Sequence, residues 1–208
     1  MRTRIKICGM TRPADVQAAA RLGVDAIGLV FHAHSARHLN LARAGELVRS
    51  VPAFVTVTGL FLDASRTEVQ RTLDAVRLDL LQFHGEESPE FCRGFGRPYV
   101  KALAMGAAPD LADCARRYHD AAALLLDSHV PGQAGGTGTT FDWQHVPQGA
   151  DLPLILAGGL NAANVAAAIR AVHPYAVDVS SGVESAPGIK DAVRMTEFVR
   201  EVNRVTGV

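Results

Sequence analysis

The chain of 208 residues has few cysteines, no net charge and no long apolar run. Its three cysteines, Cys8, Cys92 and Cys114, lie far apart without a CxxC spacing, so we expect neither a disulfide framework nor a metal site. Lysine plus arginine and aspartate plus glutamate both total 21, so the chain lacks the basic field that nucleic-acid binding usually requires.

No apolar run approaches the roughly 18 residues that span a bilayer, and the first residues are polar rather than an apolar leader. We therefore expect no membrane partner and a cytoplasmic location in which the thiols stay reduced. Hydrophobic residues make up 48% of the chain, which is enough for an ordinary globular core.

Short apolar runs alternate along the whole chain with longer amphipathic segments. Several runs, such as "AALLLD", are almost continuously apolar, as expected for parallel strands that are covered on both faces. Helices are expected between them, one with Pro13 near its start and another with Asn161 as its N-terminal cap. The predicted strands are 4–8, 25–31, 54–62, 78–83, 99–102, 122–127, 152–157 and 176–179.

This alternation predicts the fold class. Strands that are each followed by a helix form a parallel sheet with right-handed crossovers. Eight such units in about 200 residues fit a closed (β/α)8 TIM barrel, with eight parallel strands ringed by helices, better than an open doubly wound sheet. We expect one barrel domain over residues 1–208.

Two strand ends carry side chains that can take part in catalysis. Cys8 ends the first strand just before Gly9, and Asp127 ends the sixth. In a barrel both would face the mouth where the active site is found. Taken locally, Cys8 could equally be a small buried hydrophobic residue, and Asp127 could cap a loop at Ser128.

The ends of strands seven and eight carry small residues instead. Glycines let backbone N–H groups approach an anion and serines add hydroxyl donors, so these two clusters predict a phosphate site. Between strands six and seven, the glycine-rich segment 132–138 is either a lid over the site or a surface loop. The predicted phosphate-binding residues are Gly158, Gly159, Ser180, Ser181 and Gly182.

Together these stretches resemble one family closely, the phosphoribosylanthranilate isomerases of tryptophan biosynthesis. The combination of "KICGMT" with "DVSSGVE" is far more specific than any lone glycine motif. The similar stretches run in the family's order over nearly the whole chain: "KICGMT" (6–11), "DAIGLVF" (25–31), "SARHL" (35–39), "LQFHGEE" (81–87), "LLLDS" (124–128), "GGTGTTFDW" (135–143), "LAGGLNAANV" (156–165) and "VDVSSGVESAPGIKD" (177–191).

The resemblance implies a cofactor-free Amadori rearrangement of a small phosphoribosyl substrate. It implies that Asp127 is the general acid that opens the ribose ring, and that Cys8, as thiolate, is the general base at the C2′ carbon. Arg37 would bind the anthranilate carboxylate, and the glycine and serine clusters would hold the phosphate. His84 would line the pocket wall or be purely structural.

A thiol with an ordinary pKa of about 8.5 needs help to act as a base near neutral pH. Lys6 shares the side of the strand that carries Cys8 but lies two residues further down, so we do not expect it to assist directly. Arg37 could assist, although its guanidinium suits a carboxylate better.

Two alternatives remain. A histidine-pathway barrel isomerase would act on a related ribose phosphate by similar chemistry. The resemblance implies that such an enzyme uses an aspartate at the end of strand one, where this chain has Cys8. A phosphate-binding barrel without catalysis would be expected to have lost Cys8 or Asp127, and both are present. The sequence predicts no particular oligomeric state.

Overall fold

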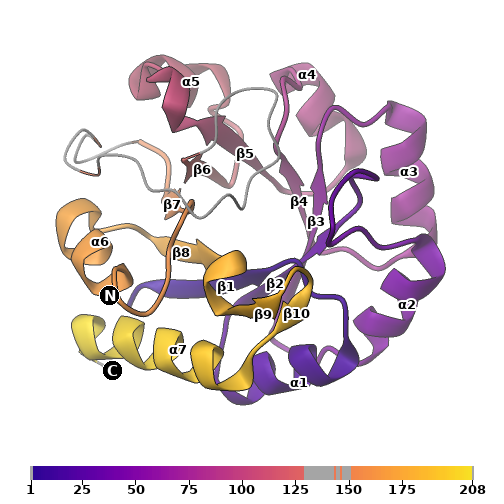
Figure 1. The fold of residues 1–208 in the computed structure, drawn as a ribbon. Coiled ribbons are helices and arrows are strands. Elements are labelled where there is room, and N and C mark those ends of the chain that lie inside the picture. Colours follow the sequence, from indigo (N-terminus) through magenta and orange to yellow (C-terminus); the bar gives the residue numbers. More distant parts are fainter. Residues whose placement is uncertain (1, 129–142, 144–145, 147–150, 208) are drawn as a thin grey trace.

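The computed structural model describes residues 2–128, 143, 146 and 151–207. Within them, eight parallel strands pair in sequence order and close on themselves, which confirms the predicted barrel (Figure 1). Every predicted strand is found, with ends that shift by no more than two residues. The strands are β1 Arg4–Cys8, β2 Ala26–Val30, β3 Thr56–Phe61, β4 Leu80–Phe83, β5 Tyr99–Ala104, β6 Ala123–Asp127, β7 Leu154–Leu156 and β8 Ala176–Val179.

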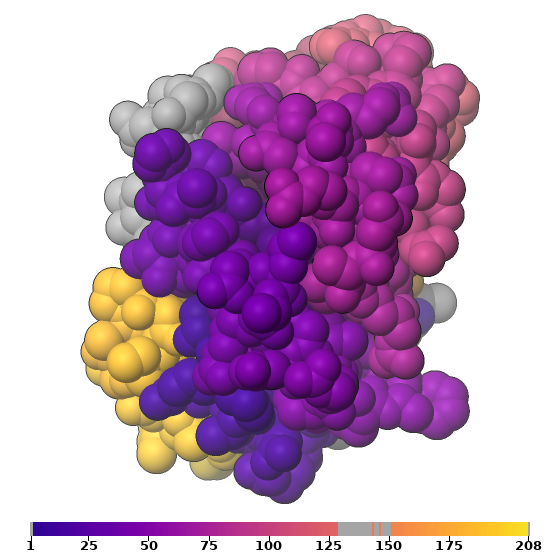
Figure 2. All heavy atoms as spheres, turned by 90° about the vertical axis from the view of Figure 1, so that its right-hand side faces the viewer, coloured from indigo at the N-terminus to yellow at the C-terminus, as the bar shows by residue number. Residues whose placement is uncertain are grey.

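Helices surround the barrel, as the ribbon in Figure 1 shows. Figure 2 views the flank that carries α2 and α3, which the first half of the chain covers, with the yellow C-terminal part at one edge. Among the described helices, none is long and apolar enough to cross a membrane. The helices are α1 Pro13–Arg21, α2 Leu41–Arg49, α3 Arg66–Ala75, α4 Pro89–Cys92, α5 Leu111–Arg117, α6 Val165–Val172 and α7 Ala192–Thr206, with short 3-10 turns η1 Arg93–Phe95, η2 Met105–Ala107 and η4 Ser181–Val183.

Local sequence explains where several helices begin. Pro13 opens α1 as predicted, because its missing N–H is not needed in a first turn. Ser65 and Glu68 form a reciprocal capping box at the start of α3. The prediction for α6 was wrong by one turn: the helix begins at Val165, and Asn161 instead accepts the N–H of Ala163 in the turn before it.

Side chains alternate between the inside of the barrel and the layer beneath the helices. Ile5 and Ile7 of β1 belong to the large core between strands and helices, so Lys6 and Cys8 point inward. By the same alternation Asp127 shares the inner face of β6 with Leu125. The barrel therefore turns a lysine, a thiol and a carboxylate toward its interior.

A small hairpin follows the barrel and was not predicted. After η4 the chain forms β9 Glu184–Ala186 and β10 Ile189–Lys190, which pair antiparallel. Figure 1 shows this hairpin beside β1, and the chain continues from it into α7. Its importance is that it brings Glu184 and Lys190, both buried, to the edge of the barrel mouth.

Candidate active site

A pocket opens at the carboxyl ends of the barrel strands, and it encloses about 740 Å³ when its mouth is included. All of the predicted site residues except Gly182 line it, and Gly182 follows directly after Ser181. The sequence did not single out Gln82 and Asp178, which also face this space. The lining residues that were predicted are Cys8, Arg37, His84, Asp127, Gly158, Gly159, Ser180 and Ser181.

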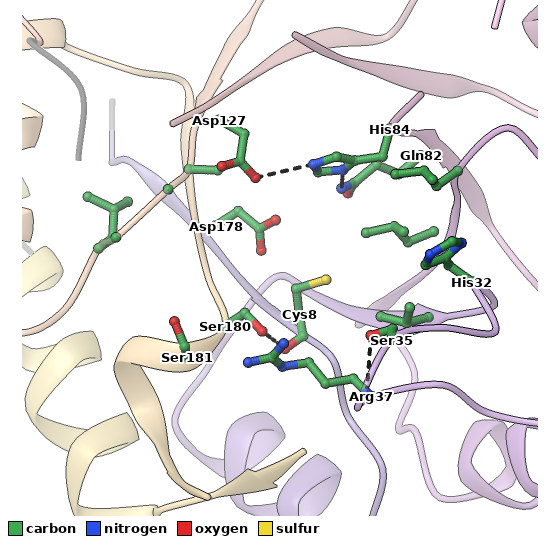
Figure 3. Close-up of a pocket in the computed structure, with 17 residues that line it drawn as sticks. Cys8, His32, Ser35, Arg37, Gln82, His84, Asp127, Asp178, Ser180 and Ser181 are labelled. Carbon is green, nitrogen blue, oxygen red and sulfur yellow. Dashed lines mark hydrogen bonds and ion pairs between the residues drawn. The ribbon is translucent and has the colours of Figure 1, made fainter. Parts of the chain in front are cut away.

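Cys8 stands at the end of β1 with its sulfur directed into the pocket (Figure 3). Its neighbour across the β1–β2 ladder is Gly28, which has no side chain to occupy the space of the thiol. A Cβ atom on Gly28 would lie only 2.6 Å from the Cys8 sulfur. The Ser180 hydroxyl donates to the Cys8 carbonyl over 3.1 Å, which ties the loop after β8 to β1.

Replacing Gly28 by alanine is therefore expected to destabilise the fold by about 1–3 kcal/mol and to displace the thiol, because the added methyl overlaps sulfur and backbone of Cys8. Urea unfolding followed by circular dichroism measures this. Gly45→Ala in α2 is the matched control, since nothing lies within 4 Å of its Cβ position. Equal stability of the two variants would show that Gly28 makes no room for Cys8.

The electrostatic surroundings of Cys8 correct the expectation for Lys6. Burial is the largest influence and leaves the pKa of the Cys8 thiol raised, although attraction to the Lys6 ammonium lowers it. Lys6 also bonds to Asp178, with 2.7 Å between Nζ and Oδ2. Lys6 and Cys8 share the inner face of β1 two residues apart, so the lysine charge acts on the thiol along the inner wall.

Asp127 lies across the pocket from Cys8 and is paired with His84 (Figure 3). Its Oδ2 is 3.2 Å from His84 Nε2, and Gln82 Nε2 is 3.1 Å from His84 Nδ1. All three side chains are buried. His84 was expected to be a wall residue or structural, and its contact with Asp127 places it beside the predicted acid.

Arg37 lines the pocket, but part of its guanidinium is already used. Nε and one terminal nitrogen donate to the two carboxylate oxygens of Glu184 over 2.8 and 2.7 Å, and this bonding is the main reason that the pKa of Arg37 is raised. Lys190 donates to the same carboxylate over 2.7 Å. Arginine has five N–H donors, so three remain for another anion.

The loops after β7 and β8 are shaped by glycine. Gly158 and Gly159 both have positive φ, 81° and 63°, a conformation that other residues rarely adopt. A Cβ on Gly182 would lie 1.9 Å from the Leu160 carbonyl oxygen, so the two loops pack together only because that atom is missing. Asn164 donates to the Gly159 carbonyl over 2.9 Å and helps to hold the β7 loop.

Two further expectations concern the surroundings of the site. The glycine-rich segment 132–138, expected as a lid or a surface loop, lies outside the described residues. Among the residues that the structure describes, no group of three histidine, cysteine or acidic side chains could hold a metal ion.

Comparison with known proteins gives a consistent result. The family model described as N-(5'phosphoribosyl)anthranilate (PRA) isomerase matches residues 5–201. The N-(5'-phosphoribosyl)anthranilate isomerase of Pseudomonas paraeruginosa is 57% identical over 199 residues, which cover 96% of this chain and 94% of that protein. The enzyme of the same name from Nitrosococcus oceani is 52% identical, with 99% of this chain and 100% of that protein covered.

Solved structures agree. Phosphoribosyl anthranilate isomerase from Thermotoga maritima superposes with a TM-score of 0.87 at 35% identity, covering 99% of this chain and 100% of that one. A phosphoribosyl anthranilate isomerase in complex with reduced 1-(o-carboxyphenylamino)-1-deoxyribulose 5-phosphate has a TM-score of 0.80 at 32% identity, with the same coverage. The barrel, its pocket and these likenesses together show that the chain is an isomerase that belongs to the N-(5'-phosphoribosyl)anthranilate isomerase family.

Proposed function

We propose that this protein converts N-(5'-phosphoribosyl)anthranilate into 1-(2-carboxyphenylamino)-1-deoxyribulose 5-phosphate, with Asp127 as general acid and Cys8 as general base. The observation that supports this most is the placement of these two groups. They come from β6 and β1, and face the same pocket from two sides (Figure 3). An Amadori rearrangement needs an acid at the ring oxygen and a base at C2′. A sugar bound between Asp127 and Cys8 can contact both groups.

Ring opening is the first step. Asp127 donates a proton to the ribose ring oxygen, and the C1′–oxygen bond breaks as the anthranilate nitrogen forms a Schiff base. The contact between Asp127 and His84 supports this role, because a hydrogen bond between the two side chains holds the carboxyl group in one orientation. Gln82 fixes the ring of His84 from the other side and so keeps this pair aligned.

Proton abstraction follows. The Cys8 thiolate takes the hydrogen from C2′, and the electron pair moves through C1′ to the nitrogen to give an enolamine. The enolamine then tautomerises to the ketone, gaining one proton at C1′ and losing one from the C2′ hydroxyl. Proton exchange with solvent returns Asp127 to the acid and Cys8 to the thiolate. These steps use proton transfers alone, so the mechanism that we propose requires no cofactor.

The ends of the substrate carry its two anions. We assign the phosphate to Gly158 and Gly159 after β7 and to residues 180–182 after β8, since glycine lets the backbone come close to the oxygens. We assign the anthranilate carboxylate to Arg37, through the N–H groups that Glu184 leaves free.

Gly158→Ala tests the phosphate assignment. Its Cβ would lie 2.3 Å from the Ser128 hydroxyl oxygen at a φ of 81°, so the loop must shift. Loss of one charge-assisted hydrogen bond predicts a KM raised by about tenfold with a smaller change in kcat. Gly96→Ala has similar backbone strain with nothing within 4 Å and should leave KM unchanged. An unchanged KM for Gly158→Ala would remove this loop from the phosphate site.

The experiment that tests the proposed function is a fluorescence assay of the purified protein with freshly generated phosphoribosylanthranilate. We expect rapid loss of substrate fluorescence and formation of the ketone. The histidine-pathway aminoimidazole ribonucleotide serves as the competing substrate and should not react. Turnover of that compound alone, or of neither, would refute the proposal in favour of the related isomerase or of a binding protein.

A further inference from the structure

A thiolate base needs a positive charge near it, and the inner wall of β1 supplies one. Lys6 and Asp178 stand opposite each other in the ladder between β1 and β8. Their side chains are only 7% exposed, and Nζ and Oδ2 are 2.7 Å apart. A buried ion pair of this kind is costly to desolvate and adds little to stability, which points to a role other than stabilisation.

We propose that the Lys6 ammonium, held in place by Asp178, stabilises the thiolate form of Cys8, which makes Lys6 a positioning residue for the base. This inference rests on the proposed function, because it assumes that Cys8 acts as thiolate. It differs from that function in assigning a task to a residue that does not have to touch the substrate.

Four charged side chains influence the pKa of Cys8, and they form two groups that differ in their carboxylate. Lys6 is bonded to Asp178, whereas Arg37 and Lys190 belong to a second group. Arg37 and Lys190 are both bonded to Glu184 at 2.7–2.8 Å. Lys6 is bonded to Asp178, shares the inner face of β1 with Cys8, and is the cation whose attraction lowers the pKa of the thiol most.

The charges of this group oppose the effect of burial, which leaves the pKa of the Cys8 thiol raised. Three cations, from Lys6, Arg37 and Lys190, face two carboxylates, from Asp178 and Glu184. One positive charge is left over, and a deprotonated Cys8 would neutralise it. Burial by itself would lower the pKa of Lys6, but attraction to Asp178 and Cys8 outweighs this and leaves the pKa raised, so the ammonium persists at neutral pH.

Loss of the Lys6 charge should show directly in the chemistry of the thiol. In Lys6→Met the pKa of Cys8 rises, since the largest influence that opposes burial is gone. Less thiolate is then present at any given pH below that pKa. We expect alkylation of Cys8 by iodoacetamide at neutral pH to be about tenfold slower. The acidic limb of the kcat/KM profile moves to higher pH, and activity recovers as the pH is raised.

The experiment measures alkylation rate against pH by mass spectrometry of the peptide that contains Cys8, which separates it from Cys92 and Cys114. Ultraviolet absorbance of the thiolate gives the same titration when the absorbance of Cys8→Ala is subtracted at each pH. This measurement needs no reagent that enters the pocket. The control variant is Lys101→Met, which removes another buried lysine of a barrel strand, paired with Glu87. It should leave the Cys8 titration unchanged.

Lys6→Met leaves Asp178 without its partner, so the double variant Lys6→Met/Asp178→Asn provides a charge-balanced test if the single variant does not fold. Lys6 influences Cys8 more strongly than Asp178 does, so the titration still moves to higher pH. An unchanged titration in either folded variant would overturn the inference. Turnover that survives in Cys8→Ala would instead refute the proposed base, whatever Lys6 does.

Discussion

Cys8→Ala is expected to lower kcat by about a thousandfold, because removal of a general base typically costs 10²–10⁴ in rate. The substituted residue is small and buried, so the fold and the phosphate site should remain. The fluorescence assay gives kcat, and KM should change much less. Cys8→Ser should be nearly as impaired, since a hydroxyl is a far weaker base than a thiolate.

The matched control for this prediction is Cys114→Ala. Cys114 is also a free buried cysteine, but it lies on α5 and does not line the pocket described above. It should retain nearly normal kcat. A rate for Cys8→Ala close to that of Cys114→Ala would mean that the base is another residue.

Asp127→Asn is expected to reduce turnover by a similar factor for a different reason. The amide keeps the size of the side chain and can still bond to His84, yet it has no acidic proton to give to the ring oxygen. Binding of the reduced product analogue should be preserved, since that compound is already open and needs no ring opening. Calorimetric titration with the analogue and the kinetic assay together separate the two effects.

A different pattern would contradict the role of Asp127. If Asp127→Asn bound the analogue far more weakly and kept its kcat, the carboxylate would be a binding group rather than the acid. The unfolding midpoint of the variant serves as the check on its fold.

The barrel and its two principal site residues could be predicted because the signals are local. Strands covered on both faces appear as short apolar runs, and their ends are marked by Cys8 and Asp127. Strand order then follows from the alternation with helices, and barrel closure brings the ends of β1 and β6 to one mouth. No long-range information was needed for that step.

The Lys6–Asp178 pair could not be predicted in the same way. It depends on the register in which β8 closes onto β1, between residues 172 positions apart. Asp178 did carry a local signal, as the acidic residue within the buried strand "AVDV". Asking where that carboxylate finds a cation would have pointed to Lys6 and corrected the expectation that it stands too far from Cys8.

The hairpin after β8 was missed because its strands are only two and three residues long. Periodicity cannot be detected over so few positions. Glu184 and Lys190 therefore looked like loop residues, although both are buried beside Arg37. Similarly, the link between His84 and Asp127 joins two strands 43 positions apart, which no local pattern reveals.

The most direct measurement of the central claim is a crystal structure of this protein with reduced 1-(2-carboxyphenylamino)-1-deoxyribulose 5-phosphate bound. We predict C2′ within about 3.5 Å of the Cys8 sulfur, near-attack distance, with Asp127 on the opposite side of the sugar chain. The phosphate should lie between the loops that carry Gly158 and Ser181. An analogue bound with C2′ far from Cys8, or with both groups on one side of the chain, would contradict the account.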